Sequence, residues 1–191
     1  MACMWYNRAM VRAGALHFMD KRWISMTEER YRAVSAWFRA RPGALAVLKW
    51  ANRLLPAVVY LSYVLMLGAL LLGRDGRFWR ALEVPAVVFV CGTWMRAKLN
   101  WARPYEVYQM APLTPKDRAG QSFPSRHLFS AAVIAMCGLW LWPPVGCALW
   151  VVTLLLAPAR VLAGVHFVRD VAAGIIFGGG MGWLAYYVLF A

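Results

Sequence analysis

The chain has 191 residues, of which 62% are hydrophobic and only 15% are charged. Soluble domains are about 45–50% apolar and about 25% charged, so this composition excludes an ordinary soluble domain and predicts a membrane protein. The net charge is +13, but many of the basic residues precede the first apolar run and alternate with aromatic residues. This distribution is typical of a membrane surface, so no nucleic-acid partner is expected.

Residues 1–53 form the first predicted unit, a basic interfacial segment. Apolar residues recur there at helical spacing, between flanking arginines: Tyr31, Val34, Trp37 and Phe38. The pattern predicts an amphipathic helix in the headgroup layer, with its aromatic side chains toward the bilayer and its cations toward anionic lipid. A helix packed against the polar end of the protein's own bundle explains the pattern equally well.

Residues 54–191 form the second predicted unit, an all-α integral membrane bundle of about five spans. Five apolar runs support this count: Leu54 to Gly73, Ala81 to Met95, Leu128 to Trp142, Val145 to Ala159 and Val171 to Ala191. The first and last runs are long enough to cross a hydrocarbon core of about 30 Å, where helices satisfy their own backbone hydrogen bonds. Pro143 and Pro144 predict a tight hairpin between the third and fourth runs. We therefore expect a multi-pass protein of the cell membrane.

Three glycines recur every four residues along the last run: Gly174, Gly178 and Gly182. Small residues at this spacing allow two helices to approach closely. We expect the glycines to pack against another helix of the same chain, and a homodimer through this face is the alternative.

Two polar loops fall on one side of the membrane if five spans alternate in direction. They are Arg96 to His127 and Arg160 to Asp170, and the N-terminal segment lies on the same side. On the opposite side the chain has three of its 21 basic residues: Arg74, Arg77 and Arg80. The excess of positive charge favours loops that face the cytoplasm, and loops on the outer face are the alternative, because arginines with a chemical role add to this count.

The first loop begins with two arginines that can hold an anion. Arg96 and Arg103 are separated by two helical turns, so both can project from one face of the helix that ends the second span. Pro104 predicts that this helix ends at Arg103. Two guanidinium groups at a helix end can clamp a phosphate, although positive-inside anchoring of the span is the simpler explanation for arginines alone.

The same loop ends in a serine and a histidine at the start of the third span. Ser125 is placed to cap the helix, whose free amide groups then form a natural site for an oxyanion or phosphate. His127 follows as a group that titrates near neutral pH. A histidine at a helix start can also have no chemical role.

The second polar loop combines a cation, a histidine and a carboxylate. His166 and Asp170 are one helical turn apart, so the carboxylate can orient the imidazole and stabilise its charged form. A histidine held in this way can act as a nucleophile. Arg160, at the end of the fourth span, adds a further cation. Charged groups at membrane depth are costly and usually functional.

In order and spacing, these segments resemble the three-part signature of the type-2 phosphatidic acid phosphatase superfamily, in its bacterial membrane branch. That signature is Lys-x6-Arg-Pro, Pro-Ser-Gly-His and Ser-Arg-x5-His-x3-Asp, and the family also includes vanadium haloperoxidases. The matching segments here are Arg96-x6-Arg103-Pro104, Pro124-Ser125-Arg126-His127 and Ala159-Arg160-x5-His166-x3-Asp170. This chain has arginine in place of the lysine, alanine in place of the first serine of the third motif, and Arg126 in place of the glycine.

The resemblance implies a membrane lipid phosphatase that works through a phosphohistidine. It implies His166 as the nucleophile, oriented by Asp170, and His127 as general acid and then base. The phosphate oxygens would be held by five further residues: Arg96, Arg103, Ser125, Arg126 and Arg160. Neither a metal nor another cofactor is expected, because arginines supply the positive charge, and the four cysteines lack metal-ligand spacing.

The expected substrate is a lipid phosphate monoester of the phosphatidic acid or phosphatidylglycerol phosphate type. A polyprenyl (undecaprenyl) diphosphate phosphatase is an alternative that would use the same residues on another headgroup. A protein that binds or translocates lipid phosphate without turnover is an alternative of a different class. Pure binding requires cations but not two histidines, which favours an enzyme.

Overall fold

The computed structural model describes residues 27–114 and 119–189, and within these ranges every regular element is a helix. The elements are α2 (Glu28–Arg39), α3 (Pro42–Leu72), α4 (Phe78–Leu99), α5 (Pro104–Val107), α6 (Arg126–Leu141), α7 (Pro143–Leu162), α8 (Val168–Trp183) and the π-helix η1 (Leu184–Leu189). The prediction of an all-α protein is confirmed.

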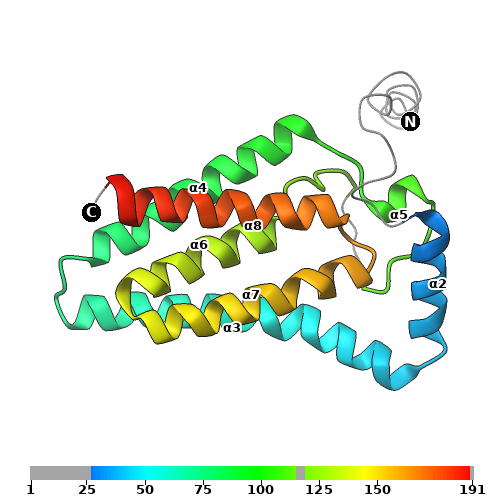
Figure 1. Ribbon diagram of the computed structural model, residues 1–191, viewed down its shortest axis with the longest axis horizontal. Helices are drawn as coiled ribbons and strands as arrows, with labels where there is room; N and C mark the ends of the chain where they lie inside the picture. Colours follow the sequence, from blue (N-terminus) through cyan, green and yellow to red (C-terminus); the bar gives the residue numbers. More distant parts are fainter. Residues whose placement is uncertain (1–26, 115–118, 190–191) are drawn as a thin grey trace.

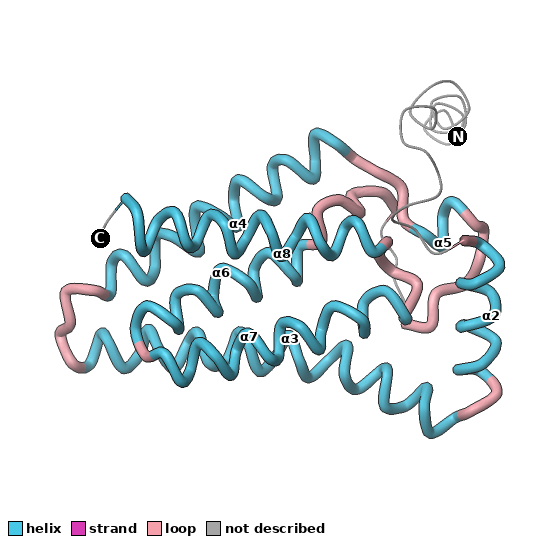
Figure 2. Tube along the Cα trace, viewed as in Figure 1, coloured by secondary structure: helices cyan, strands magenta, loops and turns pink. Residues whose placement is uncertain are grey.

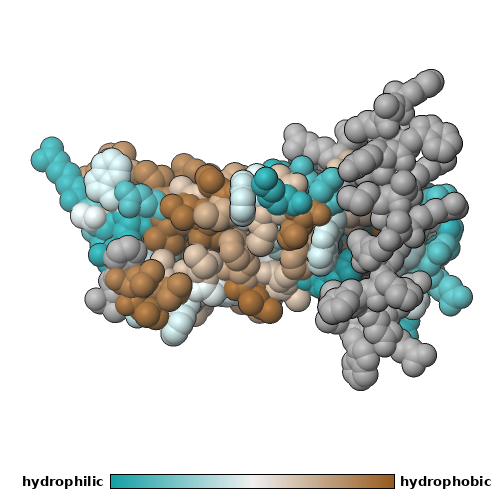
Figure 3. Space-filling view, turned by 90° about the horizontal axis from the view of Figure 1, so that it is seen from above, coloured by the Kyte–Doolittle hydropathy of each residue, from teal (hydrophilic) through white to brown (hydrophobic). Residues whose placement is uncertain are grey.

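Five of these helices form an elongated bundle with α6 at its centre (Figure 1). Among the described residues, four segments are long and apolar enough to span a membrane: Pro42–Leu72, Phe78–Val107, Pro143–Leu162 and Val168–Leu189. The remaining helix, α6, has 16 residues and is buried along most of its length, because α4, α7 and α8 pack around it. An apolar band separates hydrophilic residues at the two ends of the molecule (Figure 3), as expected for a membrane bundle.

The first bundle helix begins earlier than the charge-free run predicts. α3 starts at Pro42, a residue that suits the first position of a helix, and not at Leu54. Its 31 residues extend over about 46 Å, which exceeds the hydrocarbon thickness of about 30 Å. Residues 42–53 therefore continue this helix beyond the apolar band, where Lys49 and Arg53 remain exposed.

The hairpin between α6 and α7 forms where the two prolines predict it. α6 ends at Leu141, Trp142 is extended, and Pro143 occupies the first position of α7. Gly146 of α7 lies against the backbone of Leu139, and a side chain there would overlap the Leu139 amide. This close approach lets the two helices pack tightly along their length.

The three glycines of α8 face α6. A Cβ on Gly174 would lie 2.8 Å from the carbonyl oxygen of Ser125, and one on Gly178 would overlap the backbone of Phe129. Packing within the chain is therefore confirmed for this face. A homodimer through Gly174, Gly178 and Gly182 stays an alternative prediction, and in this structure α6 lies against all three residues.

α2 packs across one end of the bundle (Figure 1), which is the second of the two interpretations of its amphipathic pattern. Tyr31 is only 1% exposed, whereas Trp37, on another face of the helix, is 48% exposed. Residues 1–26 of the predicted interfacial segment lie outside the described residues.

The loops between α4 and α6 and between α7 and α8 lie at the same end of the bundle as α2 (Figure 2). This arrangement follows from helices that alternate in direction, as the five-span prediction requires. The turn at residues 73–77 and the hairpin at Trp142 lie at the opposite end.

Candidate active site

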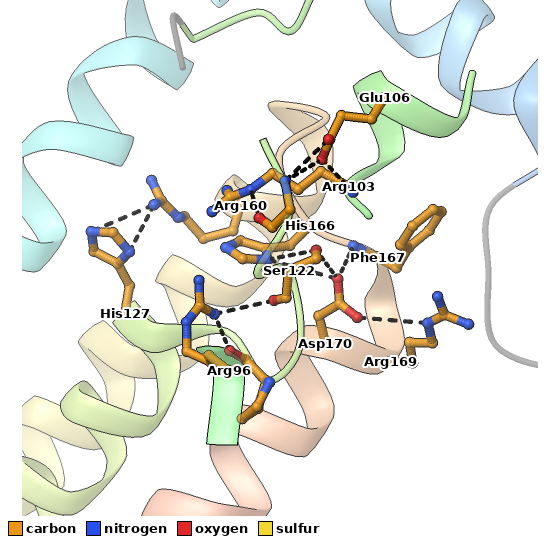
Figure 4. Close-up of polar contacts among 12 residues, drawn as sticks. Arg96, Arg103, Glu106, Ser122, His127, Arg160, His166, Phe167, Arg169 and Asp170 are labelled. Atoms are coloured by element: carbon orange, nitrogen blue, oxygen red, sulfur yellow. Dashed lines mark hydrogen bonds and ion pairs between the residues drawn. The ribbon is translucent and has the colours of Figure 1, made fainter. Parts of the chain in front are cut away.

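His166 lies in the short loop that joins α7 to α8, and its side chain is 2% exposed. Its Nδ1 is 3.7 Å from Oδ2 of Asp170 and 3.4 Å from Oγ of Ser122. Ser122 also donates a hydrogen bond of 2.5 Å to the same carboxylate oxygen. The three side chains therefore form one buried group (Figure 4), in which Nε2 of His166 is directed away from the carboxylate.

Asp170 is held firmly at the beginning of α8. Its Oδ2 accepts a hydrogen bond of 3.0 Å from the amide of Phe167, which starts the helix. The Asp170 carbonyl accepts a hydrogen bond of 2.8 Å from the amide of Ser125, so the start of α8 is tied to the start of α6. A carboxylate with so many donors stays ionised easily and makes a rigid support for the imidazole.

Burial lowers the pKa of His166 to about 4. The positive charges of Arg160 and Arg103 lower it further, while the nearby carboxylate of Asp170 acts in the opposite direction. His166 is therefore neutral at physiological pH, which is the state that a nucleophilic nitrogen requires.

Arg160 connects α7 to the second histidine and to α3. Its Nη2 lies 2.8 Å from Nδ1 of His127, and its Nη1 donates a hydrogen bond of 3.0 Å to Oδ1 of Asn52. Asn52 in turn donates to the carbonyls of Leu48 and Ala159, at 3.0 and 2.9 Å. The guanidinium is thus aimed at the start of α6 by a side chain from the first bundle helix.

Arg96 and Arg103 both reach the site, but from different elements. Arg96 lies on α4 and donates to the carbonyls of Ser122 and Pro124, so it organises the loop before α6. The expectation that Arg103 shares the helix with Arg96 is wrong. α4 ends at Leu99 because Asn100 is left-handed, with φ of 43°.

Arg103 instead precedes the short helix α5. Its Nε donates a hydrogen bond of 2.9 Å to the carbonyl of Gly120. Glu106 accepts hydrogen bonds from the amides of Arg103 and Gly120, at 2.9 and 2.8 Å. The loop is thereby closed around the arginine, and the guanidinium is presented to the site next to His166 (Figure 4).

Several donors in this region are buried without an acceptor. Ser125 occupies the N-cap position of α6 as predicted, but its hydroxyl makes no capping hydrogen bond. Within residues 27–114 and 119–189, Ser125 Oγ, Arg103 Nη1 and Arg160 Nε have no hydrogen-bond partner. Unpaired buried donors are costly, so this group fits an anion such as phosphate.

Arg126 is half-buried at the first position of α6. It lies close enough to Arg96 and Arg160 to interact with both electrostatically. Together with Arg103, these residues bring four guanidinium groups to the site. Among the described residues, no group of three or more His, Cys, Asp or Glu side chains could hold a metal ion.

Ser122, Asn52 and Glu106 were not predicted as part of the site. Ser122 stands in the polar segment before α6, but sequence spacing does not reveal which carboxylate it would meet. Asn52 could have been predicted from the sequence, because a polar side chain next to a long apolar run usually has a buried partner. Glu106 accepts hydrogen bonds from backbone amides, and no sequence pattern predicts such a contact.

Comparison with known proteins agrees with this geometry. The sequence profile of the PAP2 superfamily matches residues 77–191. No curated protein matches the chain significantly. Two bacterial proteins of known structure share its fold at low identity.

The first is a transmembrane PAP2-type phosphatidylglycerolphosphate phosphatase from Bacillus subtilis, which is 24% identical with a TM-score of 0.57. That alignment covers 96% of this chain and 92% of the other. The second is LpxE from Aquifex aeolicus, 22% identical with a TM-score of 0.65 over 87% of this chain and 98% of the other.

The family profile covers more than half of the chain, including all the residues predicted to carry the chemistry. The three motifs come together at one end of a membrane bundle, and its fold is that of the two bacterial structures. The chain belongs to the PAP2 superfamily, the type-2 phosphatidic acid phosphatase family that its motifs predict.

Proposed function

We propose that the protein is a lipid phosphatase of the cell membrane that hydrolyses a phosphate monoester of the phosphatidic acid or phosphatidylglycerol phosphate type without a metal. The observation that carries this proposal is the set of buried, unpaired donors beside a neutral histidine. Ser125 Oγ, Arg103 Nη1 and Arg160 Nε lack acceptors within the described ranges. A phosphate group would supply acceptors for all of them.

In the first step, Nε2 of His166 attacks phosphorus and the bond to the lipid oxygen breaks. His127 gives its proton to that oxygen, which leaves as the lipid alcohol. In the second step, His127 takes a proton from water while the water oxygen attacks phosphorus. The phosphorus–nitrogen bond breaks, which releases phosphate and restores His166.

The state of His127 must change when the substrate binds. While Nδ1 accepts from Arg160, this nitrogen has no proton to give to the leaving oxygen. A phosphate dianion would attract the Arg160 guanidinium and free Nδ1 to take up a proton. Arg96, Arg103, Arg126 and Ser125 would hold the remaining phosphate oxygens, where negative charge must be stabilised during transfer.

The Bacillus subtilis neighbour is by name a phosphatidylglycerolphosphate phosphatase, which suits a lipid monoester as the substrate. Arg126 supports the alternative of a polyprenyl diphosphate, because it adds a cation beside Arg96 and Arg160. Two histidines in the site argue against the alternative of a non-catalytic lipid-phosphate binding or translocating protein.

Phosphate release from purified lipids would separate these functions. We expect the protein in detergent micelles, with excess EDTA present, to release phosphate from phosphatidic acid or phosphatidylglycerol phosphate faster than from undecaprenyl diphosphate. A reversed preference would support the diphosphate alternative. Activity that is lost in EDTA and restored by magnesium would contradict the metal-free mechanism, and no release from any lipid would favour a binding protein.

The proposed roles of the two histidines can be separated with an aryl phosphate, whose leaving group needs no protonation. We expect His127→Ala to form a labelled phosphoenzyme with this substrate and then stall, because the second step lacks its base. His166→Ala should form none, because it lacks the nucleophile. Label on His166→Ala would reverse the assignment, and label on neither variant would favour direct attack by water.

A further inference from the structure

Tyr31 connects α2 directly to the loop that carries His166. Its hydroxyl donates a hydrogen bond of 3.0 Å to the backbone carbonyl of His166, across 135 residues of sequence. The ring packs against those of Tyr108 and Phe167, with centroids 5.8 and 6.2 Å away. Burial raises the pKa of Tyr31 well above its ordinary value, so its hydroxyl stays protonated and remains a donor.

Two arginines fasten α2 to the neighbouring loop. Arg39 donates a hydrogen bond of 2.9 Å to the carbonyl of Ala111, and Arg32 one of 3.3 Å to the carbonyl of Tyr108. α2 is therefore attached both to the loop after α5 and to the loop before α8. The PAP2 profile begins at residue 77, so this helix lies outside the part of the chain that the profile covers.

The loop between α7 and α8 needs such a support. It turns through Gly164, which has φ of 73°, a conformation that favours glycine. His166 follows this turn and precedes the first turn of α8. Asp170 and Ser122 hold the imidazole ring, and Asp170 also accepts from the Phe167 amide, whereas Tyr31 is the side chain that holds the carbonyl of the same peptide group.

We propose that Tyr31 is a positioning residue for the nucleophile, which it holds through the backbone carbonyl of His166. This inference rests on the proposed function, in which Nε2 of His166 attacks phosphorus. With the carbonyl held by Tyr31 and Nδ1 held by Asp170 and Ser122, the residue is fixed on both sides of its Cα. Nucleophilic attack is sensitive to such placement, because small displacements of the attacking atom cost large factors in rate.

Tyr31→Phe tests this role because it removes the hydroxyl and leaves the ring packing intact. The matched control is Tyr63→Phe, since the Tyr63 hydroxyl also donates to a carbonyl, that of Ala81, at 3.0 Å near the other end of the bundle. We expect kcat to fall about tenfold in Tyr31→Phe with KM nearly unchanged, and neither to change in Tyr63→Phe.

Vanadate inhibition provides a readout that general loosening of the fold would not produce. Vanadate accepts a fifth ligand from a nucleophile, as phosphorus does in the transition state, whereas phosphate is held only by the surrounding donors. Tyr31→Phe should weaken inhibition by vanadate several-fold more than inhibition by phosphate. Equal weakening of both, or wild-type values for kcat and vanadate, would overturn the inference.

The proposed function is checked separately in the same experiment. If the wild type hydrolyses the lipid and His166→Ala does not, the function stands whatever Tyr31→Phe does. If His166→Ala retains activity, the proposed mechanism fails and the inference about Tyr31 fails with it. Tyr31→Phe and Tyr63→Phe should unfold in detergent at the same midpoint. A lower midpoint for Tyr31→Phe alone, together with equal weakening of inhibition by vanadate and phosphate, would assign Tyr31 a purely structural role.

Discussion

At the scale of single residues, the two histidines differ mainly in burial and in the charge of their neighbours. His166 is enclosed beside a carboxylate and a hydroxyl, and burial lowers its pKa to about 4. His127 is half-buried and faces the guanidinium of Arg160. The proposed nucleophile, His166, must be unprotonated before the substrate arrives, and the proposed acid, His127, must gain a proton. These different surroundings suit the two proposed roles.

The lowered pKa of His166 predicts a specific titration. Its ring is neutral above about pH 5, so its NMR resonances should not move between about pH 5.5 and 8, where an ordinary histidine titrates. Histidine-labelled protein in micelles would show this, with His166→Ala identifying the resonance. A midpoint near 6.5 for that resonance would mean that His166 is far less enclosed than the structure describes.

Ser122 is expected to act through Asp170. Its hydroxyl donates to the carboxylate that supports His166, and hydrogen bonds to charged groups are worth about 1.5–3 kcal/mol. Ser122→Ala should therefore lower kcat about ten- to hundredfold with a small change in KM.

The matched control is Ser130→Ala, because the Ser130 hydroxyl is also buried but has no hydrogen-bond partner in the described part of the chain. Steady-state kinetics should leave that variant at wild-type activity. Equal losses in both variants would show that the Ser122 effect comes from packing alone.

At the scale of elements, the position of α8 depends on how closely it approaches α6. The backbones meet at Gly174 and Gly178, and this contact brings Asp170 to the start of α6. The glycine spacing that suggests helix packing in the sequence is therefore also what places the carboxylate beside His166.

Gly178→Ala should disrupt this contact, because its Cβ would overlap the carbonyl of Phe129. Overpacking of this kind costs about 1–3 kcal/mol. Gly180→Ala, on the same helix, meets nothing within 4 Å and should be neutral or slightly stabilising. Thermal unfolding in detergent compares the two variants directly. Equal midpoints for both would mean that α8 can move away from α6 without loss.

The sequence was a good guide to elements and a weaker guide to contacts. Apolar runs and Pro143 predicted the helices because lipid leaves the backbone no alternative to internal hydrogen bonds. Local spacing also predicted the His166–Asp170 pair. The predicted position of Arg103 on the α4 helix is wrong, because the left-handed conformation of Asn100 depends on tertiary contacts that the local sequence does not specify. The Tyr31 contact joins residues 135 positions apart, which no local pattern encodes.

At the scale of the whole molecule, positive charge is distributed unevenly between the two ends. The turn opposite the site contains Arg74 and Arg77, and Arg80 follows it on α4. The other basic residues of the sequence belong to the site end or to segments predicted beside it. The positive-inside rule places this larger charge in the cytoplasm.

Cysteine labelling tests this orientation. In a variant without native cysteines, Gly76→Cys lies in the exposed turn opposite the site, and Arg30→Cys lies on α2. We expect an impermeant maleimide to label Gly76→Cys in intact cells and Arg30→Cys only after permeabilisation. The reverse pattern would place the site on the outer face, where the substrate would come from the outer leaflet.

The site draws a residue from every helix of the bundle: Asn52 from α3, Arg96 from α4, His127 from α6, Arg160 from α7 and Asp170 from α8. During biosynthesis, the final helix is the last to leave the ribosome and enter the membrane. A partly inserted chain therefore lacks the carboxylate that lies beside His166. Under the proposed mechanism, catalytic activity would thus report that membrane insertion is complete, and an unfinished chain would not consume lipid.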